Sequence, residues 1–375
     1  MDIIKDIVKT AGLVNQYLEK VFMKERKNIP SNDMALKLFE MAYDYTMRGG
    51  KRLRPIAMIK LYYFIKKKID ENIIAPALGV EFLQNSSICH DDIMDEDVLR
   101  RGKPTVQVMS AEIFLKKILL KKYSDPSFWM GKESLYKIMD DYKNIYRNGI
   151  SYAILAGNLL FSFAFKTVAE SNMDLNKKIY VIQKLLELYI RLNYGQAIDI
   201  EQESRYDVTI NDYLNMIDAK TGALFYIPME MAAVLSDLPN SDVFKIKEWA
   251  RLIFQAFQIR DDILGTFGRE EKTGKPIDSD IKEGKRTLLV IHSLKNLDEN
   301  ERKIFLNILG NRLATSEQID IVRKFMVKTG ALKYAEEMSR KLYLKSLEHL
   351  EQANIPSEAK DFFKKFSEYI ITRRK

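Results

Sequence analysis

The chain has 375 residues, 46% of them hydrophobic and 30% charged, a globular composition that is long enough to bury a large core. Its single cysteine, Cys89, excludes an internal disulfide and suits a reducing compartment. The net charge of +8 fits nucleic acid, an anionic membrane or an anionic small substrate, and does not by itself separate these partners.

The pattern of apolar residues predicts helices along most of the chain. Residues 1–12 have neither a signal peptide's apolar core nor a transit peptide's composition, so we expect a cytoplasmic protein. Apolar residues recur with helical spacing over 36–47 and 181–192, and no run is typical of a strand. Only 16 glycines and 9 prolines interrupt the chain, which favours long helices. We predict one all-α domain over residues 1–375.

Three segments are interpreted as structural. Lys66–Lys68 is a solvated helix end instead of a nucleic-acid patch. Residues 108–147 are rich in lysine and contain the breakers Ser124–Ser127, which indicates a surface insertion with one or two short helices. The uncharged stretch Gly149–Phe165 is too short and too polar for a membrane span, so we expect a buried core helix.

The first acidic cluster is Asp91-Asp92-Ile93-Met94-Asp95. On a helix Asp91 and Asp95 share a face, and Asp92 lies about 100° round. The cluster is either a solvated acidic face or a cation site. Three crowded carboxylates repel one another, and a bound cation would offset that repulsion. Mg²⁺ characteristically bridges such carboxylates to substrate phosphates. The apolar residues before the cluster and the arginines after it favour the cation site.

The second acidic pair, Asp261 and Asp262, follows about 170 residues later on another apolar helical segment. Gln258 lies on the same helix face as this pair. Two acidic helices of this kind indicate carboxylates that face one another across a cavity, a recurrent way to hold metals in a bundle.

Separate basic segments accompany the carboxylates. Gly49–Pro55 places two glycines before Lys51, Arg52 and Arg54, and it lacks the spacing of a P-loop. Glycines allow a backbone to approach an anion closely, and arginine matches phosphate oxygens with its fork of donors. Single lysines at Lys220 and Lys275 are weak signals alone. Together with the carboxylates they indicate two anionic groups bound side by side, one through metal and one by Arg and Lys.

In these motifs and their order the chain resembles the trans-prenyltransferases, the farnesyl and geranylgeranyl diphosphate synthases. The resemblance runs from about Tyr45 to the C-terminus and is interrupted by residues 108–147. It is carried by Gly49–Pro55, Asp91–Asp95, Arg100–Thr105, Gly195–Asp199, Lys220–Thr221, Gln258–Asp262 and the basic ending Tyr369–Lys375.

The resemblance implies roles for individual residues. The metal ligands would be Asp91, Asp92, Asp95, Asp261 and Asp262. The catalytic residues would be Lys220, Thr221 and Gln258. The two diphosphates would be bound by Gly50, Lys51, Arg54, Gln84, Arg100, Arg101, Lys275, Lys285 and Arg373.

The resemblance also implies a bundle of roughly ten helices around a central cavity, in a homodimer without nucleic acid or stable membrane insertion. Such enzymes use about three Mg²⁺ ions per site, for which Mn²⁺ can substitute. The implied reaction joins isopentenyl diphosphate to dimethylallyl, geranyl or farnesyl diphosphate. We expect geranylgeranyl diphosphate as the main product with farnesyl diphosphate also released, and the alternative is a farnesyl diphosphate synthase.

Product length is predicted from the residues one turn before Asp91. Ser86 and Ser87 are small where farnesyl-type enzymes generally carry aromatic residues, so the cavity would remain open for a further isoprene unit. Phe161 is the candidate floor of the cavity, although it fits an ordinary core position equally well.

Two positions depart from the family pattern, since Gly265 ends the second acidic motif and Asn158 stands where aspartate is common. Neither departure removes a residue required for the chemistry. A terpene cyclase or squalene-type synthase of this fold would lack the Gly-Lys-x-x-Arg motif, and a non-catalytic partner subunit would be expected to lose aspartates or lysines.

Overall fold

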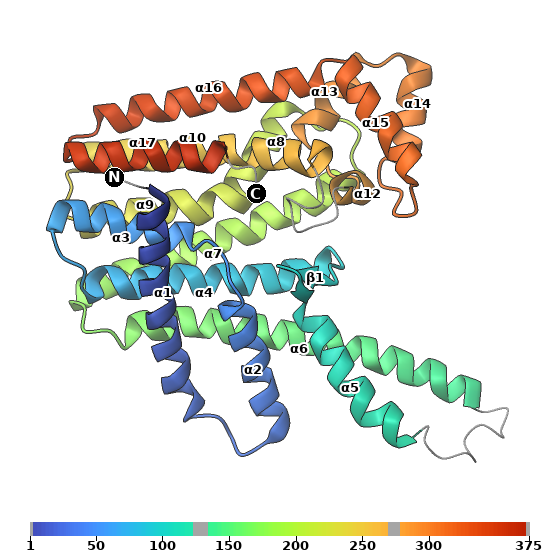
Figure 1. The fold of residues 1–375 in the computed structure, drawn as a ribbon, viewed down its shortest axis with the longest axis horizontal. Coiled ribbons are helices and arrows are strands. Elements are labelled where there is room, and N and C mark those ends of the chain that lie inside the picture. Colours follow the sequence, from blue (N-terminus) through green and yellow to red (C-terminus); the bar gives the residue numbers. More distant parts are fainter. Residues whose placement is uncertain (1–2, 123–133, 269–277, 373–375) are drawn as a thin grey trace.

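The structure is a computed structural model that describes residues 3–122, 134–268 and 278–372. Helices make up most of it, which confirms the predicted all-α fold (Figure 1). The N-terminal part contains α1 (Ile3–Arg26), α2 (Asp33–Met47), α3 (Leu53–Lys66), α4 (Glu71–Met94), α5 (Val106–Lys122) and α6 (Ser134–Ala169). The remainder contains α7 (Leu175–Ser204), α8 (Ile210–Ile217), η2 (Asp218–Gly222), α9 (Ala223–Leu235), α10 (Asn240–Phe267), α12 (Ser279–Glu283), α13 (Leu288–Asn296), α14 (Glu299–Ile308), α15 (Ser316–Lys328), α16 (Ala331–Gln352) and α17 (Ser357–Ile371).

Helix α4 is the central helix of the N-terminal part. Its residues Ile73–Leu83 are buried on every face, and it packs against α3, α6, α7 and α9. A helix that is apolar all round is expected in a core rather than on a surface. The polar C-terminal end of α4 leaves this core, and it carries Asp91 and Asp95.

Buried apolar residues form two clusters that α10 connects. The larger cluster surrounds α4 and α9 and includes Phe82 and Trp249. The smaller cluster lies among α8 and α13 to α16 and includes Ile259 and Phe305. Because Trp249 and Ile259 both belong to α10, this helix runs from the larger cluster into the smaller one. Asp261 lies on the part of α10 that packs in the smaller cluster.

A short hairpin follows α4, although the sequence indicated no strand. The antiparallel strands β1 (Leu99–Arg100) and β2 (Lys103–Pro104) are joined by Arg101 and Gly102, whose φ angles are 56° and 71°. Two positive φ values are typical of a type I′ turn. Strands of two residues are too short to produce a detectable alternation of apolar and polar residues, which is why the pattern missed them.

Residues 108–147 were predicted as a surface insertion with one or two short helices. The described part of that segment belongs to α5 and to the first half of α6, which have 17 and 36 residues and extend side by side beyond the rest of the molecule (Figure 1). One stretch of α6, Asp141–Ala169, is long and apolar enough to cross a membrane by length and composition. Core helices pass the same criterion, and α6 packs along α4.

Candidate active site

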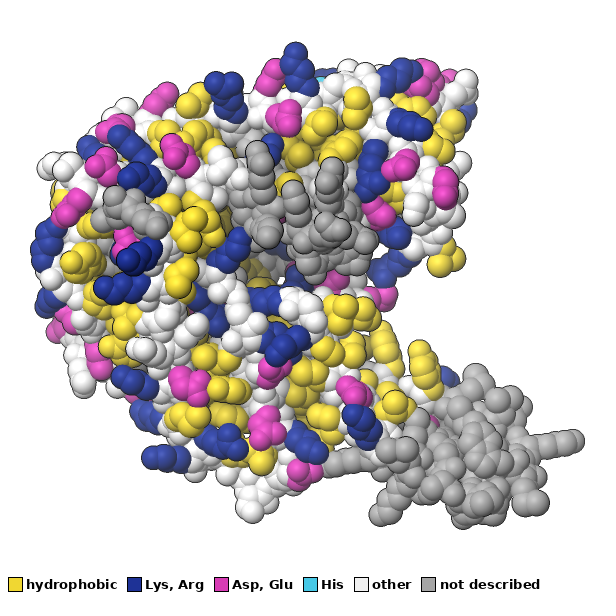
Figure 2. Space-filling model, in the orientation of Figure 1, with side chains coloured by type: hydrophobic (Ala, Val, Ile, Leu, Met, Phe, Trp, Pro, Cys, Tyr) yellow, Lys and Arg dark blue, Asp and Glu magenta, His cyan; other side chains and the backbone are white. Residues whose placement is uncertain are grey.

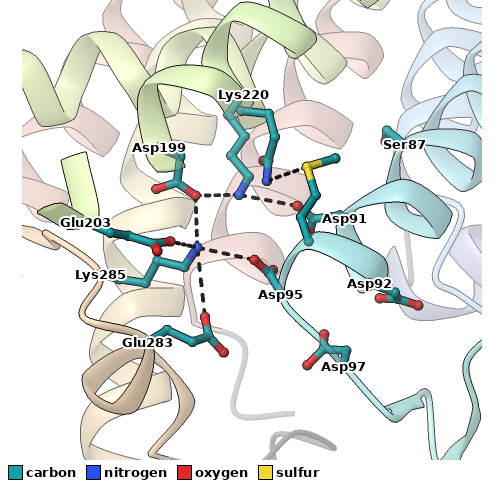
Figure 3. Close-up of polar contacts among 12 residues, drawn as sticks. Ser87, Asp91, Asp92, Asp95, Asp97, Asp199, Glu203, Lys220, Glu283 and Lys285 are labelled. Carbon is teal, nitrogen blue, oxygen red and sulfur yellow. Dashed lines mark hydrogen bonds and ion pairs between the residues drawn. The ribbon is translucent and has the colours of Figure 1, made fainter. Parts of the chain in front are cut away.

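Lysine and carboxylate side chains from four segments meet beyond the end of α4 (Figure 3). Lys220 Nζ lies 2.6 Å from Asp199 Oδ2 and 3.5 Å from Asp91 Oδ1. Lys285 Nζ lies 3.2 Å from the same oxygen of Asp199 and 3.4 Å from Asp95 Oδ1. The two lysines therefore connect the acidic end of α4 with α7.

The charges in this cluster shift one another's protonation equilibria. Burial alone would raise the pKa of Asp199, but Lys220 and Lys285 lower it below its ordinary value. Burial alone would lower the pKa of Lys220, but Asp91 and Asp199 raise it. The pKa of Lys285 is raised against burial by Asp199 and Asp95. Both lysines are therefore held as cations, each paired with carboxylates from α7 and from the end of α4.

The backbone around Lys220 explains why Gly195 precedes this site. Lys220 and Thr221 lie in η2, a π-helical segment between α8 and α9, and π segments are frequent at functional sites. A Cβ at Gly195 would come within 2.3 Å of the backbone nitrogen of Lys220. Glycine thus allows α7 to approach η2 closely, which brings Asp199 to the lysine ammonium.

Asp92 and Asp262 have other partners than these lysines. Asp92 is buried, accepts a 2.6 Å hydrogen bond from Tyr45 and is paired with Arg100. Asp262 is buried in the same way and accepts hydrogen bonds of 2.7 Å from Tyr213 and 2.9 Å from Gln258. Figure 3 shows Asp92 turned away from Asp91 and Asp95. Both carboxylate oxygens of Asp92 and of Asp262 therefore have hydrogen-bond partners in this structure.

Asp91 remains suited to a cation. Its Oδ1 is buried and accepts no hydrogen bond from the described residues, so its only opposing charge there is the ammonium of Lys220. Among the described residues, no three His, Cys, Asp or Glu side chains lie close enough to hold a metal by themselves. The carboxylate oxygens are hard donors, but they are too few to complete a metal's coordination shell. This suits Mg²⁺, which takes further ligands from substrate phosphates.

The hairpin brings arginines to the basic segment before α3. Arg101 donates to the backbone oxygen of Gly49 at 2.5 Å, and a Cβ at Gly50 would lie 3.0 Å from the guanidinium of Arg101. Gly49 and Gly50 have φ angles of 119° and 114°, which favour glycine. The predicted grouping of Gly50 and Arg101 therefore exists, whereas Arg100 is held by Asp92 and Asp97.

Arg54 and Lys51 lie near this grouping, since Arg101 is close enough to lower the pKa of Arg54 and Lys51 follows Gly50 in the chain. The guanidinium of Arg54 stands 5.4 Å from the ring of Phe254, and its Nε is buried without a hydrogen-bond partner among the described residues. Burial lowers the pKa of Arg54 to about 10, although Glu81 opposes the shift. The ammonium of Lys51 is 5.7 Å from the ring of Tyr369. Figure 2 shows a hollow on the face in view, with Lys and Arg side chains at its edge.

The residues predicted to control product length lie on α4 and α6. Ser86 is fully buried, whereas Ser87 is half-buried and lies one turn before Asp91. The ring of Phe161 packs 4.7 Å from that of Tyr189, whose hydroxyl is 3.5 Å from His90 Nδ1. Phe161 on α6 therefore contacts Tyr189 of α7, which in turn contacts His90 of α4.

Some predicted residues are not part of the observed cluster. Lys275 and Arg373 lie outside the described residues. Gln84 is half-buried on α4, below the aspartates.

Sequence reasoning assigned no role to Asp199 or Glu203. Asp199 accepts hydrogen bonds from both lysines, and Glu203 accepts one of 2.7 Å from Lys285. The two acids are four residues apart on α7, so a shared helix face was an available signal.

The sequence pattern of the polyprenyl synthetase family matches residues 36–123 and 131–326. The chain belongs to the polyprenyl synthetase family. As a member it is a prenyltransferase, with the gap in the match falling between α5 and α6.

Named relatives of this family member cover most of its length. It is 35% identical to a short chain isoprenyl diphosphate synthase of Methanocaldococcus jannaschii, over 84% of either chain. It is 33% identical to a geranylgeranyl diphosphate synthase of Sulfolobus acidocaldarius, over 90% of this chain and 92% of the relative. The crystal structure of a geranylgeranyl pyrophosphate synthetase from Pyrococcus horikoshii superposes on this chain with a TM-score of 0.77 and 32% sequence identity. The match covers 99% of this chain and 98% of the other.

Proposed function

We propose that this prenyltransferase condenses isopentenyl diphosphate with allylic diphosphates in a Mg²⁺-dependent reaction, and that its main product is geranylgeranyl diphosphate. The observation that carries the proposal is the pair of lysines between the carboxylates of α4 and α7, beside a separate basic group of Lys51, Arg54 and Arg101. Two adjacent cationic sites of different composition suit two diphosphates that must be told apart.

In this proposal the metal is held by Asp91, Asp92, Asp95, Asp261 and Asp262. Bound Mg²⁺ would neutralise the allylic diphosphate and so favour ionisation of its C1–O bond. To bind it, Asp92 and Asp262 would exchange the hydrogen bonds that they accept from Tyr45 and Tyr213.

The protein's own residues bind and orient the substrates. Lys220 and Lys285, held as cations by acidic neighbours, would bind the allylic diphosphate when it enters. Arg54 and Lys51 would hold isopentenyl diphosphate so that its double bond attacks C1. Thr221 and Gln258, to which the resemblance gives this role, would face the developing cation. The proton lost in the last step would pass to the departing diphosphate.

A product of geranylgeranyl length is supported by Ser87, the small half-buried residue one turn before Asp91. An aromatic residue there would close the path along α4. A farnesyl diphosphate synthase, the alternative, would need a residue other than Ser87 to block this path. For a product of geranylgeranyl length, Phe161 is the candidate for the deeper floor of the cavity.

We further propose a cytoplasmic homodimer that binds no nucleic acid and does not insert stably in a membrane. One face of α7 exposes apolar residues at intervals of mostly four, including Leu186 and Ile190, with Ile154 and Leu155 exposed on α6. A continuous apolar stripe of this kind is typical of an interface. A second copy of the chain would cover it.

The proposal is tested by product analysis with purified protein, Mg²⁺, isopentenyl diphosphate and each allylic primer in turn. Geranylgeranyl diphosphate should predominate, and EDTA should abolish turnover. Farnesyl diphosphate as the end product would favour the alternative. A cyclic hydrocarbon, or no product with any primer, would instead indicate a cyclase or a non-catalytic subunit.

A further inference from the structure

A second cavity, of about 640 Å³, lies away from the aspartates at the end of the molecule formed by α8, α13, α14 and α16. That volume is in the usual range for sites that bind small molecules. The loop before α8 contributes Tyr206, α13 contributes His292 and Lys295, α14 contributes Arg302, and α16 contributes Tyr334. The relatives' names and the family motifs assign nothing to these residues.

The cavity is lined by cations without acidic partners. Arg286, Lys295 and Arg302 line it, and no described carboxylate lies within ion-pair distance of any of the three. Asp207 also lines the cavity, but it is paired with Arg205 at 2.9 Å. Arg286 is 93% buried, since 7% of its surface is exposed. Burial lowers the pKa of Arg286, although Tyr206 and Glu203 partly oppose the shift. A buried arginine of this kind is costly unless an anion binds there.

Arg286 is also held in a fixed orientation. Its Nε donates to the backbone oxygen of Arg205 at 2.7 Å, and its Nη1 donates to that of Gly284 at 3.2 Å. Its guanidinium lies 5.5 Å from the ring of Tyr206. Lys285, the preceding residue, instead reaches Asp95 and Asp199 in the active site (Figure 3). The chain thus presents two consecutive cations to two different sites.

Flat rings form another wall of the cavity. The ring of His292 stacks on that of Tyr334, with centroids 4.6 Å apart and planes 28° apart. Leu294 and Val208 provide apolar surface beside them. Aromatic faces next to unpaired cations suit a ligand that joins phosphate to a planar ring.

We propose that this cavity binds a phosphorylated small molecule with an aromatic ring, of the size of a nucleoside diphosphate. The phosphates would lie on Arg286 and Arg302, and the ring would lie against the aromatic side chains of Tyr206, His292 and Tyr334. Such binding would be independent of prenyl transfer, so it can be measured without substrates.

The test is calorimetric titration of the full chain with ADP in EDTA, which suppresses metal-dependent binding at the aspartates. We expect saturable binding, and inorganic diphosphate, which has no ring, should bind about tenfold more weakly or worse. Arg302→Gln should weaken ADP binding about fivefold or more through loss of a charge-assisted contact. The matched control is Lys303→Gln, the adjacent exposed cation on α14 that does not line the cavity.

Three results would overturn the proposal. The first is no ADP binding up to about 5 mM, an affinity too weak to matter. The second is an equal effect of Arg302→Gln and Lys303→Gln on ADP affinity. The third is loss of ADP binding in Arg54→Ala without any loss in Arg302→Gln. The last result would place ADP in the active site. None of these results depends on whether the chain makes a prenyl product, so a failure here is distinct from a failure of the proposed function.

Discussion

The two residues of each aspartate pair have different environments. Asp91 keeps a buried oxygen that accepts no hydrogen bond from the described residues, whereas both oxygens of Asp92 are occupied. Asp262 likewise receives hydrogen bonds on both oxygens, while Asp261 is exposed on α10. A tyrosine from another helix, Tyr45 or Tyr213, turns the second aspartate inward in each pair.

The first prediction follows from that difference. Asp91→Asn should lower turnover by about three orders of magnitude or more, because the amide keeps the shape but removes a charge that the metal needs. The control is Glu96→Gln, which removes an exposed acid only five residues away and should stay within about threefold of wild type. Steady-state rates at saturating Mg²⁺ decide the matter, and wild-type-like turnover in Asp91→Asn would remove Asp91 from the metal site.

A second prediction separates the two diphosphate sites. Arg54→Ala should raise the KM for isopentenyl diphosphate about tenfold or more and change the KM for the allylic primer little, because the lost contact serves one substrate. Arg54→Lys should recover part of the affinity, since the charge remains but the fork of donors is lost. Equal increases in both KM values would contradict separate sites. Initial rates measured against each substrate in turn provide the two constants.

Individual elements decide which of these residues meet. The hairpin β1–β2 carries Arg101 back to Gly49, and the π segment η2 presents Lys220 to α7. Helix α4 carries Asp91 and the serines about one turn before it, and Asp95 follows its last residue. Because an α-helix rises about 5.4 Å per turn, close to the length of one isoprene unit, we propose that the register of α4 relates residue position to product length.

The third prediction uses this register. Ser87→Phe should shift the product from geranylgeranyl towards farnesyl diphosphate, because the ring would occupy the path of the growing chain. Ser87→Ala, which adds no volume, should leave the product unchanged. Chromatography of the products gives the ratio. Melting temperature must be measured as well, since overpacking can destabilise a helix core by about 1–3 kcal/mol. A well-folded Ser87→Phe enzyme with the wild-type product ratio would show that chain length is set elsewhere.

At the scale of the whole molecule, the outer face of α7 is left uncovered. Ile190 is 52% exposed in the middle of the apolar stripe, and Leu344 on α16 is 50% exposed. Single exposed apolar residues are common on monomers, whereas a stripe along a 30-residue helix is typical of an interface.

The fourth prediction compares these two positions. Ile190→Glu should convert a dimer into a monomer of about 43.7 kDa, because a charge would be buried at the centre of the contact. Leu344→Glu changes an equally exposed residue outside the stripe and should remain dimeric. Light scattering coupled to size-exclusion chromatography measures both masses. A wild-type chain that is monomeric at micromolar concentration would exclude the proposed homodimer.

The sequence by itself determined the fold class and the chemical kinds of the site residues. Few glycines and prolines and a helical period of apolar residues lead to an all-α fold, since that period is a local property of the chain. The spacing in Asp91–Asp95 placed two carboxylates on one face of α4 without any knowledge of neighbouring helices. The glycines before Lys51 indicated a backbone that approaches an anion, and both have positive φ.

Only the tertiary structure decided which residues face one another. Asp92 and Asp262 are turned inward by Tyr45 and Tyr213, partners that lie 47 and 49 residues away in sequence. Asp199 binds both lysines because Gly195 allows α7 to approach η2. Hydrogen-bond partners and close approaches of this kind depend on helix packing, and packing between distant segments leaves no periodic signal in a single sequence.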